Sequence, residues 1–297
     1  MLAVVQFYWS AVVLLLPLLA CAGIGAYWAK RDYPFGGTFI TMLVTTVTTP
    51  ALVFHTFVTT QLDDRALLAI AGASLLALLA CALACAGLLR LFGLPVRTLL
   101  PTAFVPNAGN LGLPVSQLAF GDAGLSAAVA FFAVNSFVTH TIAVRMLPGA
   151  NTPGSWKSPV LLASVAAVTL RALDIPVPDW LVAPSRMLGA VTVPLMLLSL
   201  GHALALIPAN GMRAGAVVAA LRLAVGLAAG YAVVWLLGLP DLLAGALALQ
   251  MAMPCAVVSY MYARRYTDVG DIAAGAVLVS TVVFLLLAPA LLWFTRQ

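Results

Sequence analysis

The chain has 297 residues, of which 64% are hydrophobic and only 8% are charged, and its mean hydropathy is +1.11. A soluble domain carries about 25% charged and about 45–50% apolar residues, so the composition excludes a water-soluble globular protein. The net charge of +5 reflects Lys and Arg in cytoplasmic loops. Because no basic run is longer than two residues, we expect no nucleic-acid partner.

Hydrophobic segments follow one another along the whole chain, near 8–28, 38–58, 66–92, 98–119, 123–146, 158–173, 187–207, 213–237, 241–262 and 272–294. A membrane-spanning helix needs about 20 apolar residues, and these runs lack the alternation of barrel strands. The sequence therefore predicts an all-α polytopic membrane protein with ten transmembrane helices, forming a single domain over residues 1–297 in the lipid bilayer. The start, MLAVVQFYWS, lacks the basic region of a cleaved signal peptide, so we expect the first span to be retained.

Basic residues alternate between the predicted loops. One set is Lys30, Arg31, Arg90, Arg97, Arg145, Lys157, Arg213, Arg264 and Arg265, and the opposite set is Arg65, Arg171, Arg186 and Arg296. The Lys/Arg bias places the first set in the cytoplasm, and both termini are then outside. The short chain and the excess of Arg over Lys favour a bacterial inner (plasma) membrane. Arg222 lies within the eighth span and is expected to extend toward the cytoplasmic interface.

The two halves of the chain contain matching short motifs. Pro50 corresponds to Pro194, Pro95 to Pro240 and Asp122 to Asp268, with offsets of 144, 145 and 146 residues. These matches predict one repeat over residues 1–146 and a second over 158–297. Because five spans are an odd number, the second repeat is inverted, which is typical of secondary transporters.

The fourth and ninth spans are interrupted at corresponding places. The fourth contains Pro106-Asn107-Ala108-Gly109-Asn110, which cannot continue a regular helix, and the ninth contains Met253-Pro254-Cys255. Paired breaks of this kind indicate a transporter binding site, whereas packing kinks are the alternative. A half-helix starting near Asn110 offers unpaired N–H groups and a positive dipole end to an anion. Pro254 suits the first turn of a second half-helix.

Both interrupted segments resemble the auxin efflux carrier family, which includes plant PIN-type carriers and bacterial malate and malonate permeases. The segments are Asn107-Ala-Gly-Asn-Leu-Gly-Leu-Pro114 and Met253-Pro-Cys-Ala-Val-Val-Ser-Tyr-Met-Tyr-Ala-Arg-Arg-Tyr266. The resemblance implies a homodimer, a scaffold of spans 1, 2, 6 and 7, and a transport domain of spans 3–5 and 8–10 that moves like an elevator. It also implies that Asn107 or Asn110 contacts the substrate carboxylate. Bacterial members often have an Asn shortly after the second proline, whereas this chain has Val257-Val258-Ser259.

Few ionisable residues are predicted inside the membrane. The chain has no Glu, and its nine Asp lie at predicted span ends or in loops. An intramembrane carboxylate is the usual cation or proton site. Its absence at mid-depth argues against Na⁺ coupling through a carboxylate cage and weakens the alternative of a carrier like the sodium/bile-acid symporters. His55, His140 and His202 lie within spans and suit either proton coupling or hydrogen bonds between helices. Asn135 and His140 share the fifth span.

Taken together, these features predict a secondary transporter for small organic anions such as mono- or dicarboxylates or auxin-like acids. The alternatives are a carrier like the sodium/bile-acid symporters, a channel and a membrane-embedded sensor. The chain contains no enzyme motif that we recognise, and we expect no catalytic residue, cofactor or metal. The candidate substrate-binding residues are Pro106, Asn107, Gly109, Asn110, Met253, Pro254, Cys255, Ala256 and Ser259, and the second-tier polar residues are Asn135, His140, His55 and His202.

Overall fold

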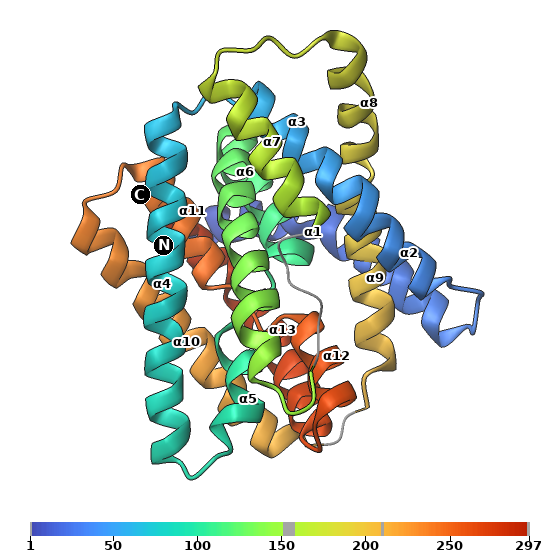
Figure 1. Ribbon diagram of the computed structural model, residues 1–297. Helices are drawn as coiled ribbons and strands as arrows, with labels where there is room; N and C mark the ends of the chain where they lie inside the picture. Colours follow the sequence, from blue (N-terminus) through green and yellow to red (C-terminus); the bar gives the residue numbers. More distant parts are fainter. Residues whose placement is uncertain (1, 151–157, 209–210, 296–297) are drawn as a thin grey trace.

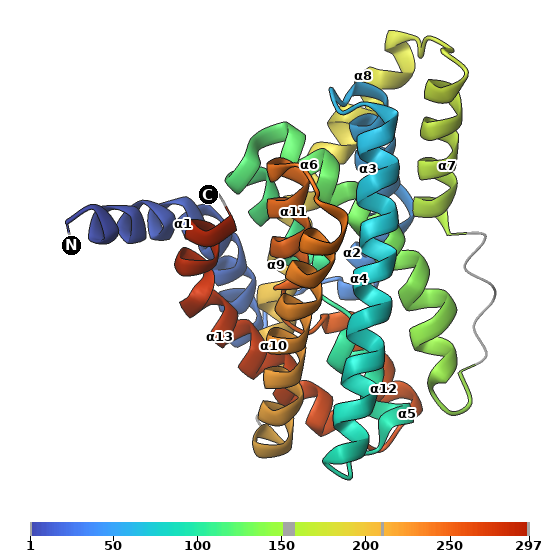
Figure 2. The same cartoon turned by 90° about the vertical axis from the view of Figure 1, so that its left-hand side faces the viewer.

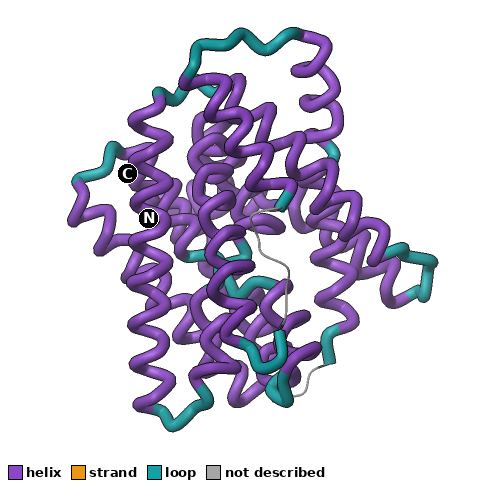
Figure 3. Tube along the Cα trace, viewed as in Figure 1, coloured by secondary structure: helices purple, strands orange, loops and turns teal. Residues whose placement is uncertain are grey.

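The computed structural model describes residues 2–150, 158–208 and 211–295. Within these ranges the secondary structure is helical, apart from one isolated two-residue bridge (Figures 1 and 3). Lys157 and Arg296, which enter the predicted orientation, lie outside the described residues.

The helices follow one another along the chain. The first half contains α1 (Leu2–Lys30), α2 (Gly37–Leu43), η1 (Val44–Thr48), α3 (Thr49–Thr59), α4 (Asp64–Leu91), α5 (Val96–Phe104), η2 (Ala108–Gly112), α6 (Leu113–Val138), η3 (Thr139–Ala143) and η4 (Val144–Met146). The second half contains α7 (Pro159–Ala172), α8 (Asp179–Ala190), α9 (Thr192–Leu206), α10 (Met212–Leu237), α11 (Asp241–Met251), α12 (Val257–Tyr266) and α13 (Gly270–Thr295). The segments η1, η2 and η3 are short π-helices that continue into α3, α6 and η4.

Many of these helices are long and apolar enough to cross a membrane. Six such segments occur among the described residues: Gly37–Thr59, Asp64–Leu91, Ala108–Met146, Asp179–Leu206, Met212–Leu237 and Gly270–Leu292. Leu15–Lys30, Pro159–Ala172 and Asp241–Met251 are shorter apolar helices. Large apolar side chains face outward, with Leu83 and Trp180 each 75% exposed and Trp235 86% exposed, as suits a lipid-facing surface. The chain is thus a polytopic α-helical membrane protein, while the count of ten spans stays a prediction.

Two span boundaries show how local sequence sets the helix ends. The predicted gap between 98–119 and 123–146 corresponds to a kink within α6 at Gly121, whose φ of 66° and ψ of −155° favour a residue without a Cβ. The predicted start of the seventh span at residue 187 is wrong, because helix α8 begins at Asp179. Pro178 precedes it in an extended conformation, and the acidic Asp179 is favourable in a first helical turn.

The helices pack in two groups. The first helix group is α1, α2, η1, α3, α7, α8 and α9, in which α1 packs along α9 and α3 packs against α7 and α8. The second helix group is α4, α5, η2, α6, η3 and α10–α13, in which α10 packs against both α4 and α13, and α11 against α6. Contacts within each group greatly exceed those between them. In Figure 2, α4 and α10 follow the long axis of the molecule, and the N-terminal part of α1 is steeply inclined to them.

Glycines bring α1 and α9 close together in the first helix group. A Cβ at Gly201 would overlap the carbonyl oxygen of Ala22, and a Cβ at Gly25 would overlap that of Leu198. Because no hydrophobic effect drives helices together within lipid, such close backbone contact is a main source of helix association.

We therefore expect the substitution Gly201→Ala to separate α1 from α9 and to destabilise the protein by about 1–3 kcal/mol, the usual range for overpacking. Thermal unfolding in detergent measures this effect. Gly23→Ala is the matched control on α1, because a Cβ at Gly23 has no atom within 4 Å. An equal loss of stability in both variants would contradict the role of close packing at Gly201.

Candidate functional site

Two helices of the second helix group are broken by proline-containing segments. Helix α5 ends at Phe104 and the next helical segment, η2, begins at Ala108, with Pro106 between them. Helix α11 ends at Met251 and α12 begins at Val257. Proline has no N–H and does not fit a helix interior, which accounts for the first break and contributes to the second.

The two non-helical segments cross and bond to each other. Asn107 donates its backbone N–H to the carbonyl oxygen of Pro254 at 2.8 Å, and Ala256 donates to Val105 at 3.2 Å. These bonds make an antiparallel bridge between Pro106 and Cys255. Irregular backbone at membrane depth needs such internal partners. The structure thus brings together the two breaks, although Pro106 and Pro254 are 148 residues apart in the sequence.

Both expected helix starts need correction. The second half-helix begins at Val257, so Pro254 lies in the crossing segment rather than in a first helical turn, and its carbonyl oxygen is used by Asn107. The first half-helix begins at Ala108, slightly before the predicted start near Asn110, with Asn107 in the N-cap position. A π-helical turn, η2, opens this half-helix, and the N–H groups of Leu111 and Gly112 both donate to the carbonyl oxygen of Asn107.

A cavity of about 850 Å³ lies at this crossing, between the two helix groups. The first helix group contributes residues from α2, η1 and α9, together with Phe35 from the preceding loop. The second helix group contributes the crossing segments and residues from η2, α6, η3 and α12. The N-terminal residues of both half-helices, Ala108 and Val257, line it. Two positive dipole ends therefore face one cavity.

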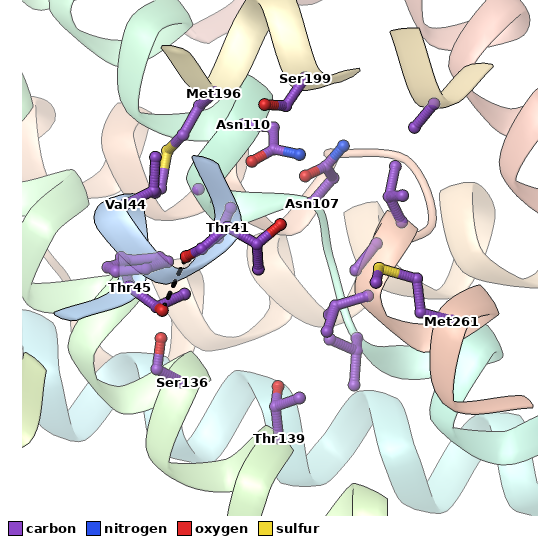
Figure 4. Close-up of a pocket in the computed structure, with 18 of the residues that line it drawn as sticks. Thr41, Val44, Thr45, Asn107, Asn110, Ser136, Thr139, Met196, Ser199 and Met261 are labelled. Carbon is purple, nitrogen blue, oxygen red and sulfur yellow. Dashed lines mark hydrogen bonds between the residues drawn. The ribbon is translucent and has the colours of Figure 1, made fainter. Parts of the chain in front are cut away.

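Uncharged polar groups line much of this cavity. Asn107 is 4% exposed and its Nδ2 has no hydrogen-bond partner among the described residues. Asn135 Oδ1 and Thr139 Oγ1 are likewise buried and unpartnered within the described chain. Figure 4 shows Asn107 and Asn110 on one side of the view and Ser136 and Thr139 on the other. A buried donor without a partner is costly, so Asn107 is well placed to bond a ligand.

Histidines and apolar side chains complete the lining. The rings of Phe35 and His202 stack with centroids 4.0 Å apart. His140 bonds through Nδ1 to the backbone carbonyl of Ser136 at 2.7 Å, and its ring meets Tyr262 edge-on. No Asp, Lys or Arg is found among the described residues that line the cavity. In those same described ranges, no group of three or more His, Cys or Asp side chains is arranged to hold a metal ion.

The predicted site residues divide into two sets. Those that line the cavity are Pro106, Asn107, Gly109, Asn110, Asn135, His140, His202 and Ala256. Those that lie elsewhere are Met253, Pro254, Cys255, Ser259 and His55. Of these, Cys255 donates its backbone N–H to Ser280 Oγ, and Ser259 Oγ donates to the carbonyl oxygen of Ala256. Through these bonds, Cys255 and Ser259 stabilise the crossing segment, but they do not line the cavity.

Sequence reasoning missed the polar residues that the first helix group contributes. These are Thr38, Thr41, Thr45 and Ser199. The threonine-rich stretch from Thr41 to Thr49 was the available signal. Thr45 Oγ1 donates to the carbonyl oxygen of Thr41 at 2.8 Å in the π-helical region (Figure 4).

The expected position of Arg222 is also wrong. Its side chain does not extend to an interface but is 0% exposed inside the second helix group. Its guanidinium donates to the carbonyl oxygens of Phe104 and Met251, the last residues of α5 and α11. These carbonyl oxygens lack helical hydrogen-bond partners because both helices end there. They are therefore available as buried acceptors for the guanidinium.

A polytopic helical protein with two broken helices that cross beside a cavity is the arrangement of a secondary-transporter fold. The chain is a membrane transporter by this measure, and comparison with known families agrees. The family described as membrane transport protein matches residues 10–156 and 152–292, nearly the whole chain. The chain belongs to this family, which confirms the resemblance to auxin efflux carriers. No curated protein matches the chain.

Proposed function

We propose that this transporter is a secondary carrier of small organic anions, such as mono- or dicarboxylates or auxin-like acids, and that it binds the substrate carboxylate at the crossing. The observation that carries the proposal is the Asn107 Nδ2 group, which has no hydrogen-bond partner among the described residues and lies beside two half-helix N-termini. The described residues that line the cavity include no acidic one. Backbone N–H groups and the positive end of a helix dipole favour an anion. An amide adds a donor without adding charge.

The packing supports alternating access by an elevator-type movement. The cavity lies between two helix groups that share few contacts with each other. In the proposal, the second helix group carries the crossing and the bound anion past the first. Four pairs or sets of elements are each counted as one span: α2–η1–α3, α8–α9, α5 with the first turns of α6, and α11–α12. With this count, the first helix group corresponds to spans 1, 2, 6 and 7, and the second helix group corresponds to spans 3–5 and 8–10.

In the proposal, the chain has ten spans in two inverted repeats, with both termini outside. In Figures 1 and 2 the α4–α5 loop, the start of α10 and the end of α12 lie at the lower end of the molecule, and the α3–α4 and α7–α8 loops lie at the upper end. Arg97 at the lower end donates to the carbonyl oxygen of Met146 at 2.8 Å. The lower end carries most of the basic loop residues, and we assign it to the cytoplasm of a bacterial cell.

Counterflow in proteoliposomes tests the function. Vesicles loaded with unlabelled malate, malonate or indole-3-acetate should take up the same labelled anion transiently and saturably, because a carrier exchanges its substrate. A channel would conduct without this exchange, and a sensor would bind without flux. Uptake at two pH values, with and without Na⁺, measures the coupling ion.

The variants Asn107→Ala and Asn110→Ala test the site within the same assay. Each removes one amide donor, and a hydrogen bond to a charged group is worth about 1.5–3 kcal/mol, so we expect about a 10- to 100-fold loss of affinity. Gln61→Ala, in the exposed α3–α4 loop, is the control. Unchanged flux and affinity in both asparagine variants would refute this site.

A further inference from the structure

Arg222 is the largest fully buried side chain of the described residues, and the proposed anion site does not use it directly. It lies within α10, in a segment that is long and apolar enough to cross a membrane. Among the described residues it forms no ion pair with an acidic side chain. A charge at this depth without a counter-ion is costly, so other groups must compensate it.

The compensating groups are the ends of the two broken helices. Nη1 donates to the carbonyl oxygen of Phe104 and lies 3.4 Å from Cys81 Sγ, while Nη2 donates to the carbonyl oxygen of Met251. One side chain from α10 thus caps the C-terminal ends of both α5 and α11. Gly226, one turn further along α10, leaves the space, because a Cβ there would overlap both Nη2 and the Met251 oxygen.

The net charge at the crossing can be estimated by summing the partial charges at the helix ends and the charge of the guanidinium. Each helix C-terminus carries about −0.5 charge and each N-terminus about +0.5. The ends of α5 and α11 together contribute about −1, which one guanidinium neutralises. The N-terminal ends at Ala108 and Val257 then leave about +1 facing the cavity. That positive charge matches one carboxylate.

In other secondary transporters, carbonyl groups at half-helix C-termini coordinate the coupling Na⁺. Here the guanidinium of Arg222 bonds to these carbonyls instead. We propose that Arg222 is a built-in cation that takes the place of a coupling Na⁺ at the crossing and makes anion binding independent of Na⁺. This inference rests on the proposed anion-carrier function. Removal of the side chain should leave a carbonyl-lined space that accepts a free monovalent cation.

Chemical rescue of Arg222→Ala in the full chain tests the proposal. In proteoliposomes we expect anion affinity to fall by about 10- to 100-fold, and to recover when guanidinium is added at millimolar concentration. Urea, a neutral molecule of the same shape, should not restore it. Wild-type uptake should be the same in Na⁺ and in choline. Arg90→Ala, on the exposed last turn of α4, should respond to none of these additions.

A second readout does not depend on the substrate. Guanidinium should raise the thermal unfolding midpoint of Arg222→Ala in detergent, relative to urea, and should leave the wild-type midpoint unchanged. If the alanine variant does not fold, Arg222→Lys is the alternative test. This variant keeps the positive charge, so the protein that carries it should bind the anion without Na⁺. A wild type that needs Na⁺, a lysine variant that needs Na⁺, or equal rescue by urea would overturn the proposal. A wild type without anion counterflow, but with guanidinium-specific rescue of stability, would instead count against the anion-carrier function alone.

Discussion

The substitution Asn107→Asp is expected to abolish anion transport. It replaces an amide whose Nδ2 has no partner among the described residues, at the N-cap position of a half-helix beside the cavity, by a carboxylate of nearly the same shape. Two like charges about 4 Å apart near a protein surface repel by about 4 kcal/mol. Because each 1.4 kcal/mol is a factor of ten, anion affinity should fall by more than about 100-fold.

Two further variants separate charge from shape and from general effects. Asn107→Leu removes the donor without adding charge, so its loss should be smaller than that of Asn107→Asp. Gln61→Glu makes the same amide-to-acid change in the exposed α3–α4 loop and should leave transport unchanged. Concentration-dependent counterflow of a labelled carboxylate measures all three. Equal losses for Asp and Leu would show that the site does not bind a negative group near Asn107.

The broken helices are the part of the fold that the sequence predicts best. Proline lacks an N–H and clashes with a preceding turn, so Pro106 and Pro254 mark breaks wherever the surrounding helices pack. Their meeting could also be anticipated, because similar positions in two related halves indicate one site. The backbone bonds from Asn107 to Pro254 and from Ala256 to Val105 are the result.

The helix starts next to these breaks were harder to predict. A proline at a first helical position is favourable, and this preference suggested a half-helix beginning at Pro254. Tertiary bonding decided otherwise, because the Pro254 carbonyl oxygen accepts a hydrogen bond from Asn107, in a segment far away in sequence. Local preferences do not contain that partner.

Arg222 and the threonines of α2 and η1 illustrate a second limit. A span boundary gives the approximate depth of a residue, and an arginine is then expected to extend toward water. Whether it instead finds free carbonyl groups depends on which helix ends lie beside it, here α5 and α11. Likewise, Thr41 and Thr45 line the cavity because α2 and η1 face the crossing. The hydrophobic periodicity of a span does not predict which helices lie beside it.

Gly109→Val is expected to slow transport through a different effect, a steric change at the contact between the two helix groups. A Cβ at Gly109 would lie 3.0 Å from Phe132 Cε2 on α6 and 3.6 Å from Met196 Cε on α9. Phe132 belongs to the second helix group and Met196 to the first, so the added methyl groups enter the cavity where the groups face each other. Overpacking costs about 1–3 kcal/mol. If this cost falls on the contact that moves during transport, the transport rate should fall by about 5- to 150-fold.

The effect of Gly109→Val on the transport rate can be distinguished from an effect on anion binding. If the groups slide past each other, Gly109→Val should lower the maximal rate of counterflow more than Asn107→Leu does at saturating substrate. Gly87→Val, on α4 where a Cβ meets no atom within 4 Å, should retain the wild-type rate and unfolding midpoint. If Gly109→Val instead bound no anion and kept no flux at any concentration, the added volume would have filled the binding site itself. Normal transport by Gly109→Val would mean that the substrate path does not pass this point and that the two helix groups separate elsewhere.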